Sequence, residues 1–193
     1  MASFSEELQE LLSSKKTNTL GIIIGNFKEK SFALLLLILM AVPALPIPTG
    51  GLTHIFEIIV ALLAIELIIG RKTVWLPKRW LEKPLPKSLQ TTALPRFIKI
   101  IKWIEKLSRP RFAKIHLNSL YLRFIGLIVL AFTTFAFIAP PYSGLDTLPS
   151  MGVVLIALGI IFEDILLTTI GIIIGSVGIG LVITLGTVAL KLL

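Results

Sequence analysis

Residues 31–56, SFALLLLILMAVPALPIPTGGLTHIF, contain no Asp, Glu, Lys or Arg side chain. Residues 124–145, 147–162 and 165–190 of the 193-residue chain are also free of these charges. Uncharged apolar runs of this length are typical of segments that lie in lipid. The mean hydropathy is +0.92, and only 16% of residues are charged, against about a quarter in an ordinary soluble domain. The sequence therefore predicts an all-α polytopic membrane protein, and the absence of cysteine excludes a disulfide scaffold.

Positive charge is concentrated in one connecting segment. Fourteen of the nineteen Lys and Arg residues and two of the eleven acids lie between Arg71 and Arg123, for a net charge of +12. Short loops rich in Lys and Arg are retained on the cytoplasmic side of a membrane. We therefore expect a basic cytoplasmic connector. A nucleic-acid surface is the disfavoured alternative, because the segment lies between apolar spans and interleaves few aromatic residues.

Proline and glycine interrupt the apolar runs at two places. Membrane helices are predicted over about 32–45, 52–70, 122–139 and 149–162, and residues 165–190 form either one tilted helix or a broken pair. The helix-breaking residues are Pro46, Pro48, Gly50 and Gly51 in the first half and Pro140, Pro141 and Gly144 in the second. Amphipathic helices are expected over 4–13 and 97–107. The predicted organisation is an N-terminal segment (1–30), a membrane unit (31–72), the connector (73–121) and a second membrane unit with its tail (122–193).

The two membrane units align with an offset of 93 residues, which pairs Pro48 with Pro141 and Gly51 with Gly144. This predicts an internal repeat, although Leu- and Ile-rich helices also align by chance. Broken helices at matching places in two halves are typical of transporter sites, because their free backbone groups must face protein or a wet cavity. The alternative is that both breaks are ordinary turns outside the membrane. Parallel and inverted repeats both remain open.

Acidic side chains within apolar segments are costly and are therefore candidates for function. His54 and Glu57 lie three residues apart on one helical face, directly after the first break. Asp146 follows the second break. Together with Thr53 and Thr147 they are predicted to form a proton or cation site, since a carboxylate beside a neutral imidazole can exchange a proton near neutral pH. The alternative leaves His54 and Asp146 solvated at the outer interface.

Opposite charges stand at corresponding ends of the two units. Arg71 follows the first unit's second helix, and Glu163 and Asp164 follow the second unit's. An ion pair of Arg71 with one of these acids is predicted to join the units, and two independent helix ends are the alternative.

The predicted helix over 97–107 has apolar residues on one side and Lys99, Lys102 and Lys106 on the other. This pattern is typical of a helix that lies in the membrane interface with its lysines near anionic headgroups. Packing against the cytoplasmic face of the protein itself is the alternative. The sequence shows no nucleotide-binding glycine loop, no metal-ligand spacing and no convincing Ser–His–Asp set, so no enzyme, cofactor or metal site is expected.

Four stretches carry a resemblance to a known family: SFALLLLILMAVPALPIPTG (31–50), LLAIELIIGRKTVWLP (62–77), LSRPR (107–111) and LPSMGVVLIALGIIFEDILL (148–167). They resemble the ExoD family of exopolysaccharide synthesis proteins. In that family a basic stop and a Trp-Leu-Pro follow the first apolar helix, here Arg71 and residues 75–77. The second short helix typically ends in an acid pair before a glycine. Ile165 stands at that glycine here, which leaves open how sharply the chain turns.

The resemblance implies a bacterial protein of the inner (cytoplasmic) membrane that is linked to exopolysaccharide production and to survival at alkaline pH. With the paired breaks, it leads us to expect a small transporter or channel-like component that moves a proton, a cation or a lipid-linked intermediate. The alternative is a non-transporting adaptor that organises a polysaccharide assembly complex. The expected partners are membrane lipids, a second copy of the chain and polysaccharide synthesis or export proteins, without nucleic acid.

Overall fold

The computed structural model describes residues 6, 9, 10, 30–45, 52–71, 73–75, 94–108, 118–140 and 143–192. Within these ranges the chain is all-helical and has no strand, as the sequence predicts. The helices are α3 (Ser31–Met40), α4 (Leu52–Ile69), α6 (Leu94–Leu107), α8 (Ser119–Ile138), α9 (Thr147–Phe162) and α10 (Ile165–Leu192). Helix α3 is shorter than expected, because residues 41–44 form turns.

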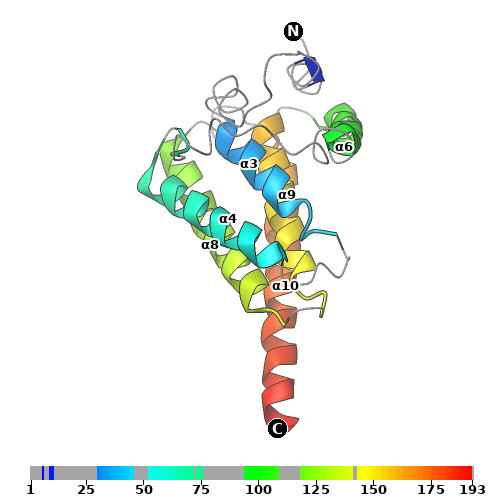
Figure 1. Cartoon of the computed structure of the whole chain (residues 1–193). Coiled ribbons are helices and arrows are strands. Elements are labelled where there is room, and N and C mark those ends of the chain that lie inside the picture. The colour runs from blue at the N-terminus through cyan, green and yellow to red at the C-terminus, as the bar shows by residue number, and fades with distance from the viewer. Residues whose placement is uncertain are drawn as a thin grey trace.

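Four helices form two hairpins that pack side by side (Figure 1). Helices α3 and α4 make the first hairpin, and α8 and α9 make the second. Each hairpin begins and ends at the same end of the bundle, where α6 also lies. Between the hairpins, α3 packs against α9 and α4 packs against α8, so the four helices close a ring of contacts.

Helix α10 runs back along α9 and makes the most extensive contact in the bundle. It is one continuous helix of 28 residues, which settles the choice between a single helix and a broken pair. At 1.5 Å per residue it spans roughly 42 Å, more than the ~30 Å hydrocarbon core of a bilayer. Its C-terminal end continues well past the ends of the other bundle helices (Figure 1).

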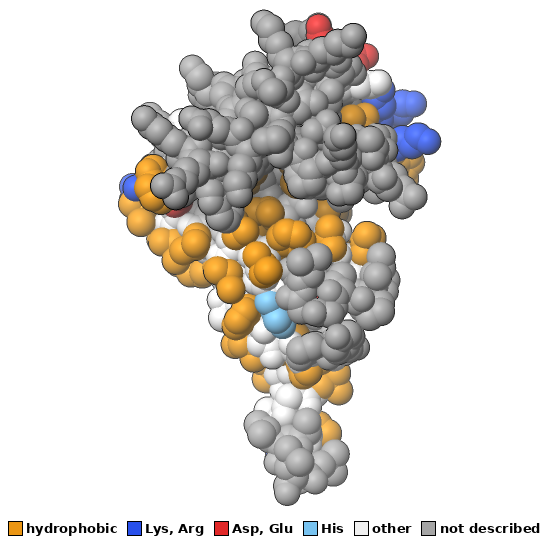
Figure 2. Space-filling model, in the orientation of Figure 1, with side chains coloured by type: hydrophobic (Ala, Val, Ile, Leu, Met, Phe, Trp, Pro, Cys, Tyr) orange, Lys and Arg blue, Asp and Glu red, His pale blue; other side chains and the backbone are white. Residues whose placement is uncertain are grey.

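Two described helices are long and apolar enough to cross a membrane. They are α8 and the part of α10 from Ile165 to Val188, with mean hydropathies of 2.0 and 2.4. Large apolar side chains also cover the outside of the bundle, as Figure 2 shows in orange. Examples are Leu62 on α4, Phe124 on α8 and Ile173 on α10, each more than half exposed. An apolar exterior of this kind matches association with lipid.

The buried centre contains apolar residues from all the bundle helices. Leu36 and Met40 of α3, Val60 of α4, Val129 of α8 and Val153 of α9 have no exposed surface. These residues belong to one contiguous cluster, which also takes in Ile101 of α6. The hairpins are therefore held together by an apolar core.

Helices α4 and α9 end in the same way. After α4, Gly70 has a φ of +86°, its N–H bonds to the Leu67 carbonyl, and the next N–H bonds to the Glu66 carbonyl. After α9, Glu163 has a φ of +56° and donates to the Ile160 carbonyl, while Asp164 donates to the Gly159 carbonyl. Both are left-handed helix caps, a conformation that normally favours glycine. The chain therefore turns sharply after α9 although Ile165 replaces the glycine of the family pattern.

Candidate functional site

Glu57 is a fully buried carboxylate within α4, on the side that faces the bundle. Its Oε2 lies 2.7 Å from Nδ1 of His54, one helical turn earlier. Its Oε1 has no hydrogen-bond partner among the described residues. A buried carboxylate is strongly unfavourable unless it is paired, hydrogen-bonded or protonated. The imidazole therefore satisfies one of the two oxygens, and the other remains available.

His54 connects this carboxylate to the surface. Its side chain is 28% exposed, and its ring packs against Phe137 of α8 with centroids 5.0 Å apart. The packing fixes the ring between α4 and α8 while one edge stays accessible. The pair thus has a buried end at Glu57 and an exposed end at His54.

The other predicted members of the polar pathway lie around the starts of α4 and α9. Thr53 is buried next to His54 in sequence. Asp146 directly precedes α9 and is half-buried. Thr147 is the first residue of α9 and is also half-buried. The structure therefore joins His54 and Glu57 by a direct contact, while Asp146 and Thr147 lie at the start of α9.

The helix breaks are only partly described. Pro46, Pro48, Gly50, Gly51 and Pro141 lie outside the described residues. Pro140 follows the end of α8 and is exposed, and the Ser143 hydroxyl donates to its carbonyl at 2.6 Å. Gly144 has a φ of +69°, with open space where a Cβ would lie. The described part of the second break is thus an exposed turn.

Ser150 is a buried polar residue that the sequence reasoning did not single out. It lies on α9, has no exposed surface, and its hydroxyl has no partner among the described residues. The 93-residue offset, applied to Glu57, leads directly to Ser150. That offset was therefore the signal that could have found it.

The charged residues at the helix ends have partners other than those predicted. Arg71 Nη1 lies 4.0 Å from Glu66 Oε2, within its own hairpin. Glu163 pairs with Lys30 at 2.9 Å, and Lys30 Nζ also donates to the Ile161 carbonyl at 2.7 Å. The predicted pairing of Arg71 with Glu163 or Asp164 is not formed, because α9 packs against α3 whereas α4 packs against α8.

Asp164 connects the turn after α9 to α6. Its Oδ1 accepts from the Leu166 N–H at 3.0 Å, which caps the start of α10. Its Oδ2 accepts from the Ser108 hydroxyl at 3.1 Å, directly after α6. Both carboxylate oxygens are therefore used at the helix ends, which accounts for the burial of this acid.

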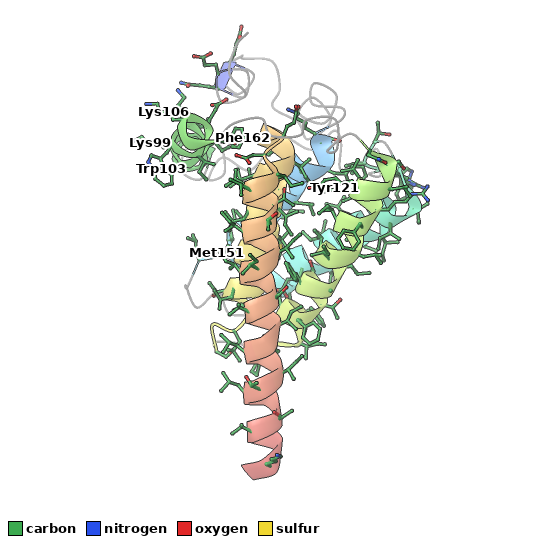
Figure 3. All side chains as sticks on the ribbon, turned by 180° about the vertical axis from the view of Figure 1, so that it is seen from behind. Lys99, Trp103, Lys106, Tyr121, Met151 and Phe162 are labelled. Carbon is green, nitrogen blue, oxygen red and sulfur yellow. The ribbon has the colours of Figure 1, made fainter. Side chains whose placement is uncertain are left out.

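Helix α6 has one buried and one exposed face. Ile101 is 2% exposed, whereas the face opposite consists of Lys99, Lys102, Trp103 and Lys106, all exposed. Lys99, Trp103 and Lys106 project away from the bundle (Figure 3). Figures 1 and 3 view α6 along its axis but the bundle helices from the side, so α6 runs crosswise to the bundle. Its apolar face thus packs on the protein itself, and its basic face points outward.

In the described part of the chain no three His, Cys, Asp or Glu side chains are grouped closely enough to hold a metal ion. Fold and site together define a small, membrane-associated protein whose described residues are helical and include a buried carboxylate paired with a partly exposed imidazole.

The family model for "Exopolysaccharide synthesis, ExoD" matches residues 4–184, and the chain belongs to the ExoD family. A protein of Synechocystis sp. described as uncharacterized is 32% identical over 176 residues, which cover 90% of this chain and 82% of the relative. Protein ExoD of Rhizobium meliloti is 26% identical over 167 residues, which cover 84% and 68%. No solved structure matches the chain significantly. Family membership links the protein to exopolysaccharide synthesis.

Proposed function

We propose that this protein supports exopolysaccharide production as a small transporter or channel-like component of the bacterial inner membrane, with Glu57 and His54 as its proton or cation site. The observation that carries the proposal is the Glu57 carboxylate. It is fully buried between apolar helices, bonded to a partly exposed imidazole, and left with one oxygen without a described partner. Buried ionisable groups of this kind are expensive and mark ion or proton pathways in membrane proteins.

The proposal includes an internal repeat of two parallel hairpins. Support comes from the 93-residue offset, which relates the left-handed caps Gly70 and Glu163 and the hydrogen bonds that close them. The contact pattern agrees, since each hairpin's first helix packs against the other's second helix. Both hairpins open toward the same end of the bundle, which favours a parallel over an inverted relation (Figure 1).

Two basic residues at corresponding positions further support the repeat relation between the hairpins. Lys30 reaches the C-terminal end of α9, where it bonds the Ile161 carbonyl. Its counterpart at the same offset is Arg123, near the start of α8. The Arg123 guanidinium lies over Gly70 at the C-terminal end of α4, since a Cβ added there would be 2.6 Å from its Nη2. Basic groups are favourable at helix C-termini, so each hairpin supplies a cation to the other.

The topology that we propose places the basic connector and α6 in the cytoplasm, with the hairpins entering the membrane from that side. Helix α3, at ten residues, covers roughly 15 Å and is too short to cross a bilayer alone. It therefore acts as a re-entrant limb. The exposed lysines of α6, together with Trp103, suit contact with anionic headgroups at the membrane surface.

The transport proposal is tested with purified protein in liposomes that contain a pH dye, with an imposed potential. Wild-type protein should carry protons or alkali cations, and Glu57→Gln and Asp146→Asn should reduce the flux. Glu66→Gln is the matched control, because Glu66 lies on the same helix but binds the Trp75 N–H at 2.8 Å near the helix end. Wild-type liposomes that carry neither ion would contradict transport.

The exposed basic face of α6 favours a second candidate function, a non-transporting adaptor for polysaccharide synthesis or export proteins. Under this hypothesis, reversing Lys99, Lys102 and Lys106 to Glu abolishes co-purification of those proteins. If the same variant instead loses only its binding to anionic vesicles, and wild-type co-purification is absent, α6 serves lipid and not a protein partner. This variant therefore distinguishes a protein partner of α6 from a lipid one.

A further inference from the structure

Helix α10 has a continuous stripe of exposed apolar side chains along its whole length. The members of the stripe recur every three or four residues, which places them on one face of the helix. Each is between 41% and 58% exposed: Leu166, Ile170, Ile173, Val177, Leu181, Leu185 and Val188. No charge interrupts the stripe, because residues 165–190 contain no Asp, Glu, Lys or Arg. An apolar surface of this extent is stable only in an apolar environment.

The contacts between α9 and α10 show how much of this stripe lies beside the bundle. A Cβ added to Gly159 would lie 2.7 Å from the Thr168 backbone nitrogen. One added to Gly178 would lie 2.5 Å from Cδ of Pro149. The two contacts are ten residues apart on both helices, so α9 and α10 are antiparallel and keep one register. The first residue of α9 is therefore level with Gly180 of α10.

The other bundle helices end at the same level. A Cβ added to Gly175 would overlap the ring of Phe132 on α8. Helix α8 ends six residues after Phe132, and six residues after Gly175 is Leu181. Near the start of α4, His54 packs against Phe137 at the end of α8, with ring centroids 5.0 Å apart. The bundle therefore ends where Leu181 lies on α10.

Residues 181–192 of α10 extend past this end of the bundle by roughly 18 Å. Side chains project from this segment to several sides, and no described helix lies beside it (Figure 3). The hydroxyls of Thr184 and Thr187 donate to carbonyls of their own helix at 2.9 and 2.8 Å, so neither requires water. Lys191 is the first charged residue after Asp164. The projecting segment is thus apolar up to its last turn.

The length of the stripe identifies its environment. Beside the bundle, from Leu166 to Leu181, it covers roughly 23 Å, which is less than the ~30 Å hydrocarbon core of a bilayer. From Leu166 to Val188 it covers roughly 33 Å, which matches that core. Charged residues bound the stripe at both ends, since Glu163 precedes it and Lys191 follows it. The bundle alone is therefore too short for a bilayer, and the projecting segment supplies the missing length.

We infer that α10 crosses the whole bilayer, so that residues 181–188 lie among the acyl chains of the leaflet far from α6 and Lys191 reaches the far headgroups. The hairpins then end inside that leaflet, because the middle of the stripe is at Val177. Polar groups at the hairpin turns, such as Asp146, require water at this depth, so water enters there from the side opposite α6. The exposed edge of His54 opens toward the same side. The inference goes beyond the proposed function, because it holds whether or not the protein carries ions.

Single cysteines test the sidedness, because the chain contains no natural cysteine. Lys106→Cys, Ser143→Cys and Lys191→Cys are all at exposed positions. Intact cells and inverted vesicles present opposite sides of the membrane to an impermeant thiol reagent. Lys191→Cys should react on the side opposite to Lys106→Cys, and Ser143→Cys on the same side as Lys191→Cys. Reaction of the two lysine replacements on one side would overturn the crossing, and no reaction of Ser143→Cys from the far side would overturn the entry of water.

Spin labels on cysteines along the stripe test the environment. The protein is placed in vesicles of phosphatidylethanolamine and phosphatidylglycerol, and each label is exposed to oxygen and to a water-soluble nickel chelate. The ratio of oxygen to chelate accessibility should be highest at Val177→Cys and should fall toward Leu166→Cys and Val188→Cys. Leu185→Cys should be accessible to oxygen but not to the chelate. Ile156→Cys is the control for burial in protein, because Ile156 has no exposed surface, and it should be accessible to neither.

The label at Leu185→Cys distinguishes lipid from the other possible surroundings. Accessibility to the chelate equal to that of a label at Lys191→Cys would overturn the inference, because the segment would then project into water. Accessibility to neither reagent would also overturn it, because a second copy of the chain or another protein would then cover the segment. Neither measurement depends on ion flux. A protein that carries no ion contradicts the proposed function and leaves this placement of α10 intact.

Discussion

The α3–α4 and α8–α9 hairpins bury corresponding positions but fill some of them with different chemistry. Val60 and Ala64 of α4 and Val153 and Ala157 of α9 are all fully buried at the 93-residue offset. One turn nearer the helix start, however, α4 has Glu57 where α9 has Ser150. The shared apolar positions build the core, and the difference confines the ionisable group to one hairpin. Only one of these two corresponding positions therefore carries a carboxylate, and the other buried acid of the described residues, Asp164, lies at the turn after α9.

The outer faces of the two second helices also differ. Gly152 and Gly159 of α9 stand where α4 has Ile59 and Glu66. The glycines face α10, since a Cβ on Gly152 would lie 2.7 Å from the Gly175 Cα and one on Gly159 would lie 2.2 Å from the Thr168 hydroxyl oxygen. On α4 the corresponding face has no such neighbour in the described part of the chain. Helix α10 thus explains why the two halves diverge in sequence.

The largest expected effect is on the proton flux through the α3–α4 hairpin, which contains Glu57. Glu57→Gln should reduce proton flux at least about 100-fold, because proton transfer through a positioned acid–base group typically contributes that much. Liposome flux and exopolysaccharide yield in complemented cells should fall together. An unchanged flux in folded Glu57→Gln protein would remove the functional distinction between the hairpins.

The next effect is on stability and tests the role of α10. Gly152→Leu should lower the unfolding free energy by about 3 kcal/mol, because overpacking against backbone cannot be relieved by a rotamer change. Ile59→Leu, at the corresponding position of α4, should change it by less than about 1.5 kcal/mol, as expected of a volume-conserving swap. Thermal unfolding of the two variants in detergent gives the comparison. An equal loss of unfolding free energy in the two variants would mean that the contact with α10 does not make the outer face of α9 more sensitive than that of α4.

The sequence alone was sufficient to predict the all-helical fold class and the positions of most of the helices. Charge-free runs placed α4, α8 and α9 within three residues of their observed ends, because lipid-facing helices need long apolar segments. The sequence also brought His54 and Glu57 together, since that contact depends only on helical spacing. It did not predict the partner of Glu163. That partner, Lys30, is 133 residues away and is set by the packing of α3 on α9, which apolar periodicity does not specify.

Ser150 was missed for a different physical reason. A serine in an apolar helix is common and often bonds to its own backbone, so its residue type alone indicates nothing. Only its burial and its correspondence to Glu57 distinguish it. A buried polar residue of this kind is thus recognised only when the packing of its helix is known.

The two left-handed helix caps should differ in their sensitivity to substitution. Gly70→Ala should destabilise the protein by about 1–2 kcal/mol, because a Cβ is strained at positive φ and would also approach the Arg123 guanidinium. Glu163→Gly should relieve a similar strain but lose the Lys30 ion pair, so its net effect should lie within about 1 kcal/mol of zero. Chemical unfolding curves of both variants make the test. Strong destabilisation by Glu163→Gly would mean that the ion pair dominates the cap.

The smallest expected effect is the difference in stability between variants of Lys30 and Arg123, the two basic residues near these caps. Lys30 binds both the Glu163 carboxylate and the Ile161 carbonyl, and its side chain is about a third exposed. Lys30→Met should therefore cost about 1 kcal/mol, the upper range for a partly exposed ion pair, and added salt should reduce the difference from wild type because it screens the pair. Arg123→Met should cost less, since an exposed cation at a helix C-terminus contributes about 0.3–1 kcal/mol. If Arg123→Met were the more damaging change, the α4 cap and not the α9 cap would be the tighter connection between the hairpins.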